Sequence, residues 1–175
     1  MKLSTDADAG AGKTTTTESR FIHPSEFHFC QSPGQIQTIL GSCIAITLWH
    51  PRRKIGGMCH FILPGRSGRN KNTSASRKLD GRYAEDAIML FDKEASRHQT
   101  RLSEYQAKIF GGSNMLVSPK RADKEMVGLR NIEAALKHLY EKNIPLLFAH
   151  VGETGSRRIK FDVNNGDVWV KHKPL

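Results

Sequence analysis

The stretch "TILGSCIAITLWHPRRKIGGMCHFILP", residues 38–64, holds two apolar segments separated by a short basic one. Both segments are rich in β-branched and aliphatic residues, and Pro51 interrupts them, so the stretch predicts a β-hairpin. With the centre of the hairpin between Pro51 and Arg52, Cys43 lies directly opposite His60. Directly opposed residues of an antiparallel pair have Cβ atoms about 4.5 to 5.5 Å apart. The spacing therefore predicts contact between a thiol and an imidazole.

A thiol beside an imidazole is the arrangement that nucleophilic catalysis by cysteine requires. The nucleophile is the thiolate, and an adjacent imidazole that accepts the thiol proton supplies it near neutral pH. Gly41 and Ser42 precede Cys43. Such small residues leave space for a substrate carbonyl, and nearby backbone N–H groups can stabilise its oxyanion. Cys59 is next to His60, so strand alternation predicts a buried structural thiol on the opposite face.

Other interpretations of these residues stay open at the level of sequence. A lone cysteine or histidine on an apolar strand is often a packed core residue, and a one-residue bulge would turn Cys43 and His60 to opposite faces. A metal site formed by these two residues and a third ligand such as His150 is a weaker alternative, because no paired ligand spacing supports it. The sequence therefore predicts neither a metal nor a cofactor.

The remaining segments predict one α+β domain that follows a disordered tail. Residues 1–20 are rich in Gly, Ala and Thr and have no periodic apolar face, which is typical of disorder. Residues 21–64 predict strands, and residues 65–79 predict a polar loop. "AKIFGGSNM" predicts a strand that ends at a Gly-Gly turn, and "PLLFAHV" predicts a buried strand. The C-terminus predicts a hairpin that turns at residues 164–166.

Two amphipathic helices are predicted among these strands. The first begins at Asp80, whose side chain can cap it, and ends at about Arg97. The second should end near Asn143, and its apolar stripe comprises Ile132, Ala135, Leu136, Leu139 and Tyr140. No internal repeat occurs, so residues 21–175 are expected to form a single domain in which a sheet carries the two helices.

The composition favours an acidic partner in a reducing compartment. The formal net charge is +10, and the charges of residues 1–20 cancel, so the excess belongs to residues 21–175. The basic residues are dispersed and match no zinc-finger or RNP-like pattern, which argues against nucleic acid; a solvated basic surface is the alternative. The absence of a CxxC pair, a leader-like start and an apolar run of ~18 residues favours a cytoplasmic location without membrane insertion.

The motifs around the cysteine and the histidine resemble the chemotaxis protein CheD family, the chemoreceptor glutamine deamidases. The resemblance is carried by "TILGSCIAI" and "GGMCHFILP", and it extends through "KIFGGSNM", "GLRNIEAAL" and "HVGETGSRRIKFDVNNGDVWV". It implies a layered α/β/β fold with a mixed or antiparallel sheet and two main helices. It also implies that Cys43 is the nucleophile and His60 the general base and acid, with Thr38 as the third residue of the site.

The same resemblance implies deamidation of receptor glutamines through a cysteine thioester. The thiolate of Cys43 would attack the carboxamide, His60 would protonate the departing ammonia, and water would hydrolyse the thioester to leave glutamate. The implied partners are methyl-accepting chemoreceptor cytoplasmic domains, whose glutamate-rich helices suit a basic surface, and a CheC-type phosphatase. The alternatives are a non-catalytic module that docks on either partner, and an enzyme that transfers the amide to a lysine.

Overall fold

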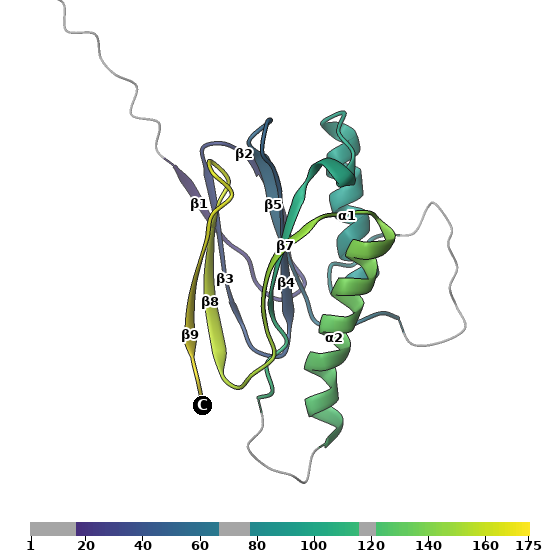
Figure 1. Cartoon of the computed structure of the whole chain (residues 1–175), viewed down its shortest axis with the longest axis vertical. Coiled ribbons are helices and arrows are strands. Elements are labelled where there is room, and N and C mark those ends of the chain that lie inside the picture. Colours follow the sequence, from purple (N-terminus) through teal and green to yellow (C-terminus); the bar gives the residue numbers. More distant parts are fainter. Residues whose placement is uncertain (1–16, 67–77, 116–121) are drawn as a thin grey trace, which may run out of the picture.

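Two β-sheets lie face to face in the computed structural model, and two helices cover the far side of one of them (Figure 1). The structure describes residues 17–66, 78–115 and 122–175, and side chains are described for all of these except residues 122–126. The outer sheet has the order β1-β3-β8-β9, with β1 at Glu18–Phe21, β3 at Gly34–Leu40, β8 at Ser156–Asp162 and β9 at Val168–Lys173. The central sheet has the order β2-β5-β4-β6-β7, with β2 at Phe27–Gln31, β4 at Ile44–His50, β5 at Ile55–Phe61, β6 at Gln106–Gly111 and β7 at Leu146–Val151.

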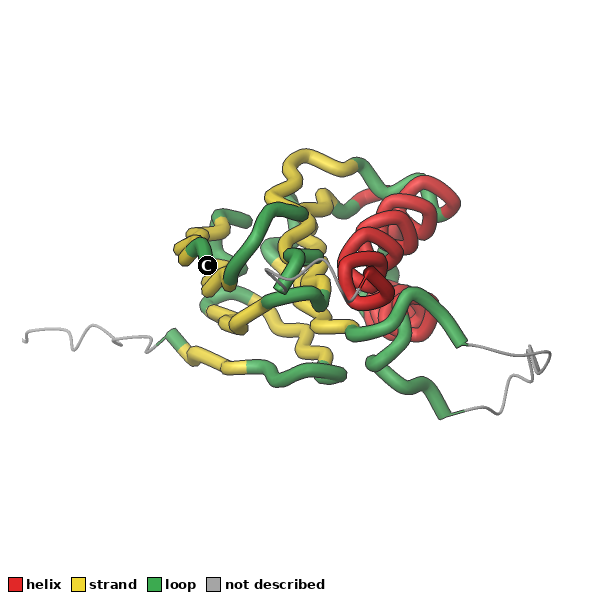
Figure 2. The backbone as a smooth tube through the Cα atoms, turned by 90° about the horizontal axis from the view of Figure 1, so that it is seen from below, coloured by secondary structure: helices red, strands yellow, loops and turns green. Residues whose placement is uncertain are grey.

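The helices form the third layer. α1 spans Ala84–Arg97 and α2 spans Ala122–Glu141, and a short 3-10 turn at Leu102–Glu104 precedes β6. Seen from below, both helices lie on one side of the strands (Figure 2). The layered α/β/β arrangement that the family resemblance implied is therefore confirmed. The residue patterns alone indicated one sheet with two helices, whereas the strands form two sheets.

Two apolar cores hold these layers together. The core between the helices and the central sheet includes Ile44, Ile46, Leu48, Cys59, Phe61, Ile109, Ala87, Ile88, Phe91, Ala135 and Leu139. The core between the two sheets includes Ile36, Leu40, Ala45, Met58, Phe110, Ile159, Phe161 and Val163. Successive residues of β4 and β5 alternate between these cores, as a strand buried on both faces requires. Burial of one such aliphatic or aromatic side chain contributes about 1.5 to 3 kcal/mol.

The hairpin of β4 and β5 has a register that differs by two residues from the predicted one. The strands are antiparallel, but His60 pairs with Ala45 and not with Cys43. The difference arises in the turn, because residues 51–54 form its loop and Lys54 adopts the left-handed conformation with a φ of 49°. A lysine gives no sequence signal for that conformation, which favours Gly or Asn. Since a shift of two residues preserves the face of each side chain, Cys43 and His60 still share one face.

The predicted cap of the first helix is wrong. α1 begins at Ala84 and its N-cap is Tyr83, which makes no side-chain capping hydrogen bond. The Asp80 carboxylate instead accepts a hydrogen bond from the backbone N–H of Arg82 at 3.0 Å. Asp80 therefore shapes the turn before the helix, a role that aspartate side chains often have.

The apolar stripe predicted for the second helix is only partly buried. Ala135 and Leu139 are buried, but Leu136 and Tyr140 are 42% and 85% exposed. The buried positions include Gly128, where a Cβ would lie 2.5 Å from the carbonyl oxygen of Gly112. This close approach fixes which side of α2 faces the sheet. The helix ends at Glu141, which agrees with the predicted end near Asn143.

β7 is a strand as predicted, but it is not buried. It forms an edge of the central sheet, and Leu146, Leu147 and Phe148 are 38%, 55% and 49% exposed. A continuous apolar run usually indicates a strand covered on both faces. Sequence alone does not reveal that β7 occupies an edge.

The predicted tail and loop fall largely outside the described residues. Residues 1–16 of the tail and residues 67–77 of the loop are not described. Glu18–Phe21, which overlaps the end of the predicted tail, forms β1 and pairs in parallel with β3. The C-terminal hairpin is confirmed, since β8 and β9 are antiparallel and Gly166 donates its N–H to the Asp162 carbonyl at the turn.

Candidate active site

His60 and Thr38 meet across the interface between the two sheets. Oγ1 of Thr38 on β3 is 2.8 Å from Nδ1 of His60 on β5. The same hydroxyl donates to the carbonyl oxygen of Ile22 at 2.8 Å. Since a hydroxyl has one proton to donate, Thr38 must accept the hydrogen bond from Nδ1. The neutral imidazole therefore carries its proton on Nδ1 and its lone pair on Nε2.

Nε2 of His60 is buried and has no hydrogen-bond partner among the described residues. The residue is 1% exposed, and burial lowers its pKa to about 4, an effect that the charge of His23 increases and that of Glu26 opposes. The ring is therefore uncharged at neutral pH. A buried polar atom without a partner costs about 1 to 3 kcal/mol. Such an atom calls for an explanation, and a proton-transfer site is one that fits a neutral imidazole.

Cys43 is a diagonal neighbour of His60. It precedes β4 by one residue and packs against the core between the sheets. Because Ala45 pairs with His60, Cys43 and His60 are diagonal neighbours on the same face. The Cα atoms of such neighbours are about 7 to 8 Å apart. Cys43 is partly exposed, whereas His60 is enclosed. Hydrogen bonds between catalytic groups are often long in a free enzyme and shorten when substrate binds.

Burial keeps the thiols of this protein protonated. It raises the pKa of Cys59 to about 12 and that of Cys30 to about 11. Burial also raises the pKa of Cys43, although a hydrogen bond from its own backbone N–H opposes the change. The resting form of Cys43 at neutral pH is therefore the thiol, which differs from the thiolate that the sequence argument expected.

The segment Gly41–Cys43 is anchored by hydrogen bonds that its three backbone carbonyl groups accept. The N–H of Ser113 donates to the first carbonyl at 2.9 Å, the side-chain amide of Asn131 to the second at 3.2 Å, and the N–H of Gly112 to the third at 2.8 Å. The C=O and N–H groups of one peptide plane point in opposite directions. The N–H groups of Ser42 and Cys43 share peptide planes with the first two carbonyls, so they point away from Ser113 and Asn131. Donors to an oxyanion would point in this direction.

The turn at the end of β6 requires glycine because it passes close to the segment Gly41–Cys43. Gly111 and Gly112 have φ values of 108° and 67°, which favour glycine. A Cβ on Gly111 would lie 2.1 Å from the carbonyl oxygen of Cys43. Any side chain there would displace the cysteine.

Arg157 is a fully buried cation that braces the same turn. Its guanidinium donates to the hydroxyl of Ser113, to the carbonyl of Gly152 at 2.8 Å and to the carboxylate of Glu153 at 3.2 Å. Its Nε donates to Nδ1 of His150 at 2.7 Å. These four partners offset the cost of burying the charge.

His150 does not join Cys43 and His60 as the metal-site alternative required. Its ring lies instead with Glu153 and His172, whose potential ligand atoms are all within 4.8 Å of one another. Because Nδ1 of His150 accepts a hydrogen bond from the guanidinium, the proton of the neutral ring lies on Nε2, which therefore has no lone pair for a metal. The contacts of this cluster fit an ion-pair network around the buried arginine.

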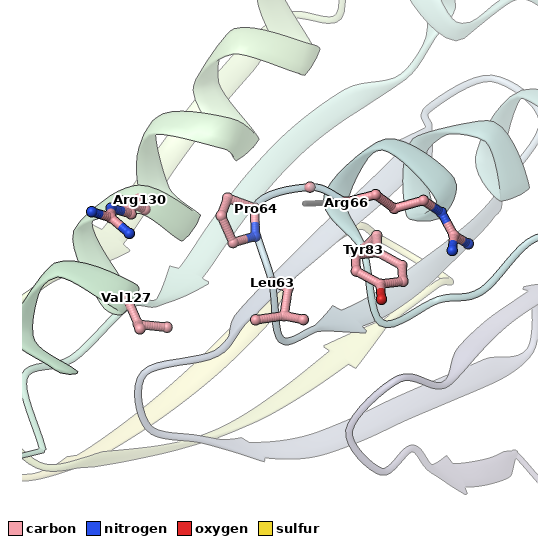
Figure 3. A pocket seen from close by; sticks show the side chains of 7 residues that line it. Leu63, Pro64, Arg66, Tyr83, Val127 and Arg130 are labelled. Carbon is pink, nitrogen blue, oxygen red and sulfur yellow. The ribbon is translucent and has the colours of Figure 1, made fainter. Parts of the chain in front are cut away.

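A pocket of about 430 Å³ opens on the helix side of the central sheet, lined by Leu63, Pro64, Arg66, Tyr83, Val127 and Arg130 (Figure 3). The guanidinium of Arg66 is 2.8 Å from the carboxylate of Asp86 and lies over the ring of Tyr83. Neither Cys43 nor His60 lines this pocket. The two residues face the layer between the sheets, so the pocket is separate from the candidate site.

The layers and the site together define a class of domain. It is an α/β/β fold that carries a cysteine and a neutral histidine on one sheet face, and a threonine from the other sheet forms a hydrogen bond with the histidine. Residues 62–172 match the family described as CheD chemotactic sensory transduction. The chain belongs to the CheD family.

Curated relatives match most of this chain. A protein of Dechloromonas aromatica (strain RCB), named "Probable chemoreceptor glutamine deamidase CheD 3", is 47% identical over 151 residues, which cover 86% of this chain and 85% of the relative. Proteins named "Probable chemoreceptor glutamine deamidase CheD" are 41% identical in Pseudomonas fluorescens (strain SBW25), over 93% of this chain and 89% of the relative, and 44% identical in Pseudomonas savastanoi pv. phaseolicola (strain 1448A / Race 6), over 88% and 84%. No helix in the described part of the chain has the length and apolar character needed to span a membrane.

The structure brings some of the predicted site residues together and adds others. Thr38 and His60 are in contact, Cys43 shares the face of His60, and Gly41 and Ser42 contribute backbone groups. Sequence reasoning missed the carbonyl of Ile22, which orients the Thr38 hydroxyl, because a backbone group leaves no pattern. It also missed Asn131, although a polar residue within an apolar helix stripe is a usable signal.

Proposed function

We propose that this protein is a chemoreceptor glutamine deamidase that hydrolyses the side-chain amide of receptor glutamines to glutamate with release of ammonia. One observation carries the proposal: Nε2 of His60 has a free lone pair and no partner among the described residues, and it lies on the face that Cys43 shares. The names of the curated relatives support this substrate class.

The first half of the reaction forms a thioester. Sγ of Cys43 attacks the carbonyl carbon of the glutamine side chain, and the thiol proton passes to Nε2 of His60. Backbone N–H groups of the Gly41–Cys43 segment stabilise the oxyanion. The imidazolium then transfers its proton to the amide nitrogen as the C–N bond breaks, and ammonia leaves. Thr38 keeps the ring oriented by accepting a hydrogen bond from Nδ1 throughout.

The second half hydrolyses the thioester. A water molecule gives a proton to Nε2 of His60 and attacks the thioester carbonyl, and the tetrahedral intermediate forms in the same donor environment. The C–S bond breaks, and the sulfur of Cys43 recovers a proton from the imidazolium. Since the pKa of His60 is lowered to about 4, the ring is a neutral base at the start of each half-reaction.

The substrate chemistry agrees with the charge of the protein. The chain has a formal net charge of +10, and the cytoplasmic domains of methyl-accepting chemoreceptors are the proposed substrates because their glutamate-rich helices are acidic. Charge complementarity of this kind accelerates association and selects partners. This assignment places the protein in the cytoplasm and requires neither a metal nor another cofactor.

A purified receptor cytoplasmic domain provides the test. Incubation with the wild-type protein is expected to release ammonia and to raise the receptor mass by the difference between OH and NH2 at each modified glutamine. The Cys43→Ala variant is the matched control and should produce neither change. Equal mass gain with both proteins, or none with either, would contradict the proposal.

A docking role in addition to catalysis is supported by the exposed apolar side chains of the edge strand β7. Leu146, Leu147 and Phe148 follow one another on this strand and are 38%, 55% and 49% exposed, and contiguous exposed apolar residues favour partner contacts. A CheC-type phosphatase is the proposed partner. Phe148→Ser should weaken its binding in a calorimetric titration while glutamine deamidation continues, and unchanged affinity would exclude this surface.

A further inference from the structure

Asn131 is a buried polar residue on the side of α2 that packs on the central sheet. It is 0% exposed and shares this side with Gly128, Ala135 and Leu139, which are also buried. Asparagine is mostly an exposed residue and a weak helix former. Its burial within an apolar stripe requires hydrogen bonds that offset the cost of removing an amide from water.

The amide nitrogen of Asn131 makes two hydrogen bonds, and both go to backbone carbonyls near the candidate site. Nδ2 donates to the carbonyl of Ser42 at 3.2 Å and to that of Ile62 at 2.7 Å. Ser42 directly precedes Cys43, and Ile62 lies two residues after His60. A single side chain therefore links the segment of the nucleophile to the strand of the base.

This link lies where the pairing of the two strands stops. The last residue pair of the β4–β5 ladder is Ile44 with Phe61. Ser42 and Ile62 lie beyond this pair, so ladder hydrogen bonds no longer fix their distance. α2 also contacts the turn that holds the Cys43 carbonyl, because Gly128 packs against Gly112. The helix thus provides a rigid support for the cysteine segment.

The amide oxygen of Asn131 shows that this arrangement has a cost. Oδ1 is buried and has no hydrogen-bond partner among the described residues. Rotating the amide by half a turn would place Oδ1 against two carbonyl oxygens, so the observed orientation is the favourable one. A leucine would avoid the unpaired oxygen but would donate no hydrogen bond. The residue is therefore better explained by its two donors than by packing.

We propose that Asn131 is a positioning residue that sets the separation of the Cys43 thiol and the His60 imidazole by tying Ser42 to Ile62. The proposal builds on the deamidase function proposed above. Asn131 does not touch the substrate; it acts through the backbone of the two segments. A shift of about 1 Å at such a site can reduce turnover by up to about 100-fold.

Asn131→Asp is the sharpest variant because it keeps the shape of the side chain and removes both N–H donors. At pH 8 we expect kcat for receptor deamidation to fall by at least ~10-fold with an unchanged KM. The introduced carboxyl faces two carbonyl oxygens, which favours its protonated form, and a protonated carboxyl can donate one hydrogen bond. The deficit relative to the wild type should therefore shrink as the pH falls from 8 to 6. Asn131→Ala, which adds no charge, should keep the same deficit at both pH values.

Labelling of Cys43 by iodoacetamide gives a readout that needs no receptor. The rate of labelling, followed against pH, should change in both Asn131 variants, whereas Leu139→Ala, a core variant on the same helix face, should lower the melting temperature and leave the labelling profile and kcat unchanged. Wild-type kcat and labelling in folded Asn131→Asp and Asn131→Ala would overturn the proposal, as would an equal change in Leu139→Ala. If the wild type does not deamidate the receptor, the proposed function fails, but the labelling profiles still decide the role of Asn131.

Discussion

Cys59 and His60 are neighbours on β5, yet they belong to different environments. Cys59 is fully buried in the core beneath the helices, and burial raises its pKa to about 12. His60 faces the other sheet, receives a hydroxyl partner from Thr38 and has a buried ring nitrogen without a partner among the described residues. The helix side of β5 contributes packing, whereas its inter-sheet side holds the groups to which the proposed mechanism assigns the chemistry.

The three thiols show why position matters more than thiol acidity here. Burial raises the pKa of Cys30, Cys43 and Cys59 alike. Only Cys43 lies diagonal to the neutral imidazole on the same face. In the proposed mechanism, His60 therefore removes the thiol proton during attack, and a resting thiolate is not required.

Replacing the two cysteines separately is the strongest way to break this comparison. Cys43→Ala should reduce deamidation to the level of a reaction without enzyme, because the thioester cannot form. Cys59→Ala should leave kcat unchanged and lower the free energy of unfolding by about 1 to 2 kcal/mol through the lost packing of one sulfur. Ammonia release and urea unfolding measure the two effects. Loss of turnover in folded Cys59→Ala would contradict the assignment of the two faces.

Two buried threonines, Thr38 and Thr47, provide a second pair of matched substitutions. Thr38→Val removes the hydroxyl that fixes the His60 tautomer, and it should lower kcat by at least ~10-fold, which equals about 1.4 kcal/mol in the transition state. Thr47 is also buried, but among the described residues its hydroxyl forms a hydrogen bond only to the Lys108 carbonyl, at 3.5 Å. Thr47→Val should therefore retain its kcat. Full activity in Thr38→Val would assign that residue to packing.

A further effect concerns the stability of the fold at low pH, not turnover. Unfolded His60 takes up a proton near pH 6.5, whereas the folded residue does so only near its lowered pKa of about 4. The unfolded state binds more protons between these values, so the free energy of unfolding falls as the pH falls through this window. The lowered pKa of His60 contributes roughly 3 kcal/mol to this change in the free energy of unfolding.

His60→Gln isolates this contribution from the other titrating groups. Urea unfolding of both proteins at pH 7 and pH 4 should show a smaller loss of stability in the variant than in the wild type. Equal losses would mean that His60 titrates in the folded protein as it does in the unfolded chain.

The family resemblance predicted the layers, and the strand pattern predicted the face that Cys43 and His60 share but not which residues pair. The β4–β5 hairpin was predictable from composition, but its register depended on the left-handed Lys54, which carries no signal. The sharing of one face by Cys43 and His60 survived because the error was an even number of residues. A one-residue error would have reversed the conclusion.

The contacts made by backbone groups could not be predicted in the same way. The Ile22 carbonyl orients Thr38, and the Gly112 N–H holds the Cys43 carbonyl. Both depend on loops that approach each other only in the folded chain. The close approach of Gly128 to Gly112 likewise determines which side of α2 faces the sheet. As a result Asn131 is buried and Tyr140 is exposed.

The protonation state of the His60 ring is the central claim, and ¹⁵N chemical shifts of ¹⁵N-histidine-labelled protein measure it directly. We predict a neutral ring with its proton on Nδ1 and a lone pair on Nε2, unchanged from neutral pH down to about pH 5, because the pKa is lowered to about 4 and Thr38 fixes the tautomer. The His60→Gln variant assigns the signal. A proton on Nε2, or an imidazolium near pH 6, would contradict the account, since neither form can accept the proton of Cys43.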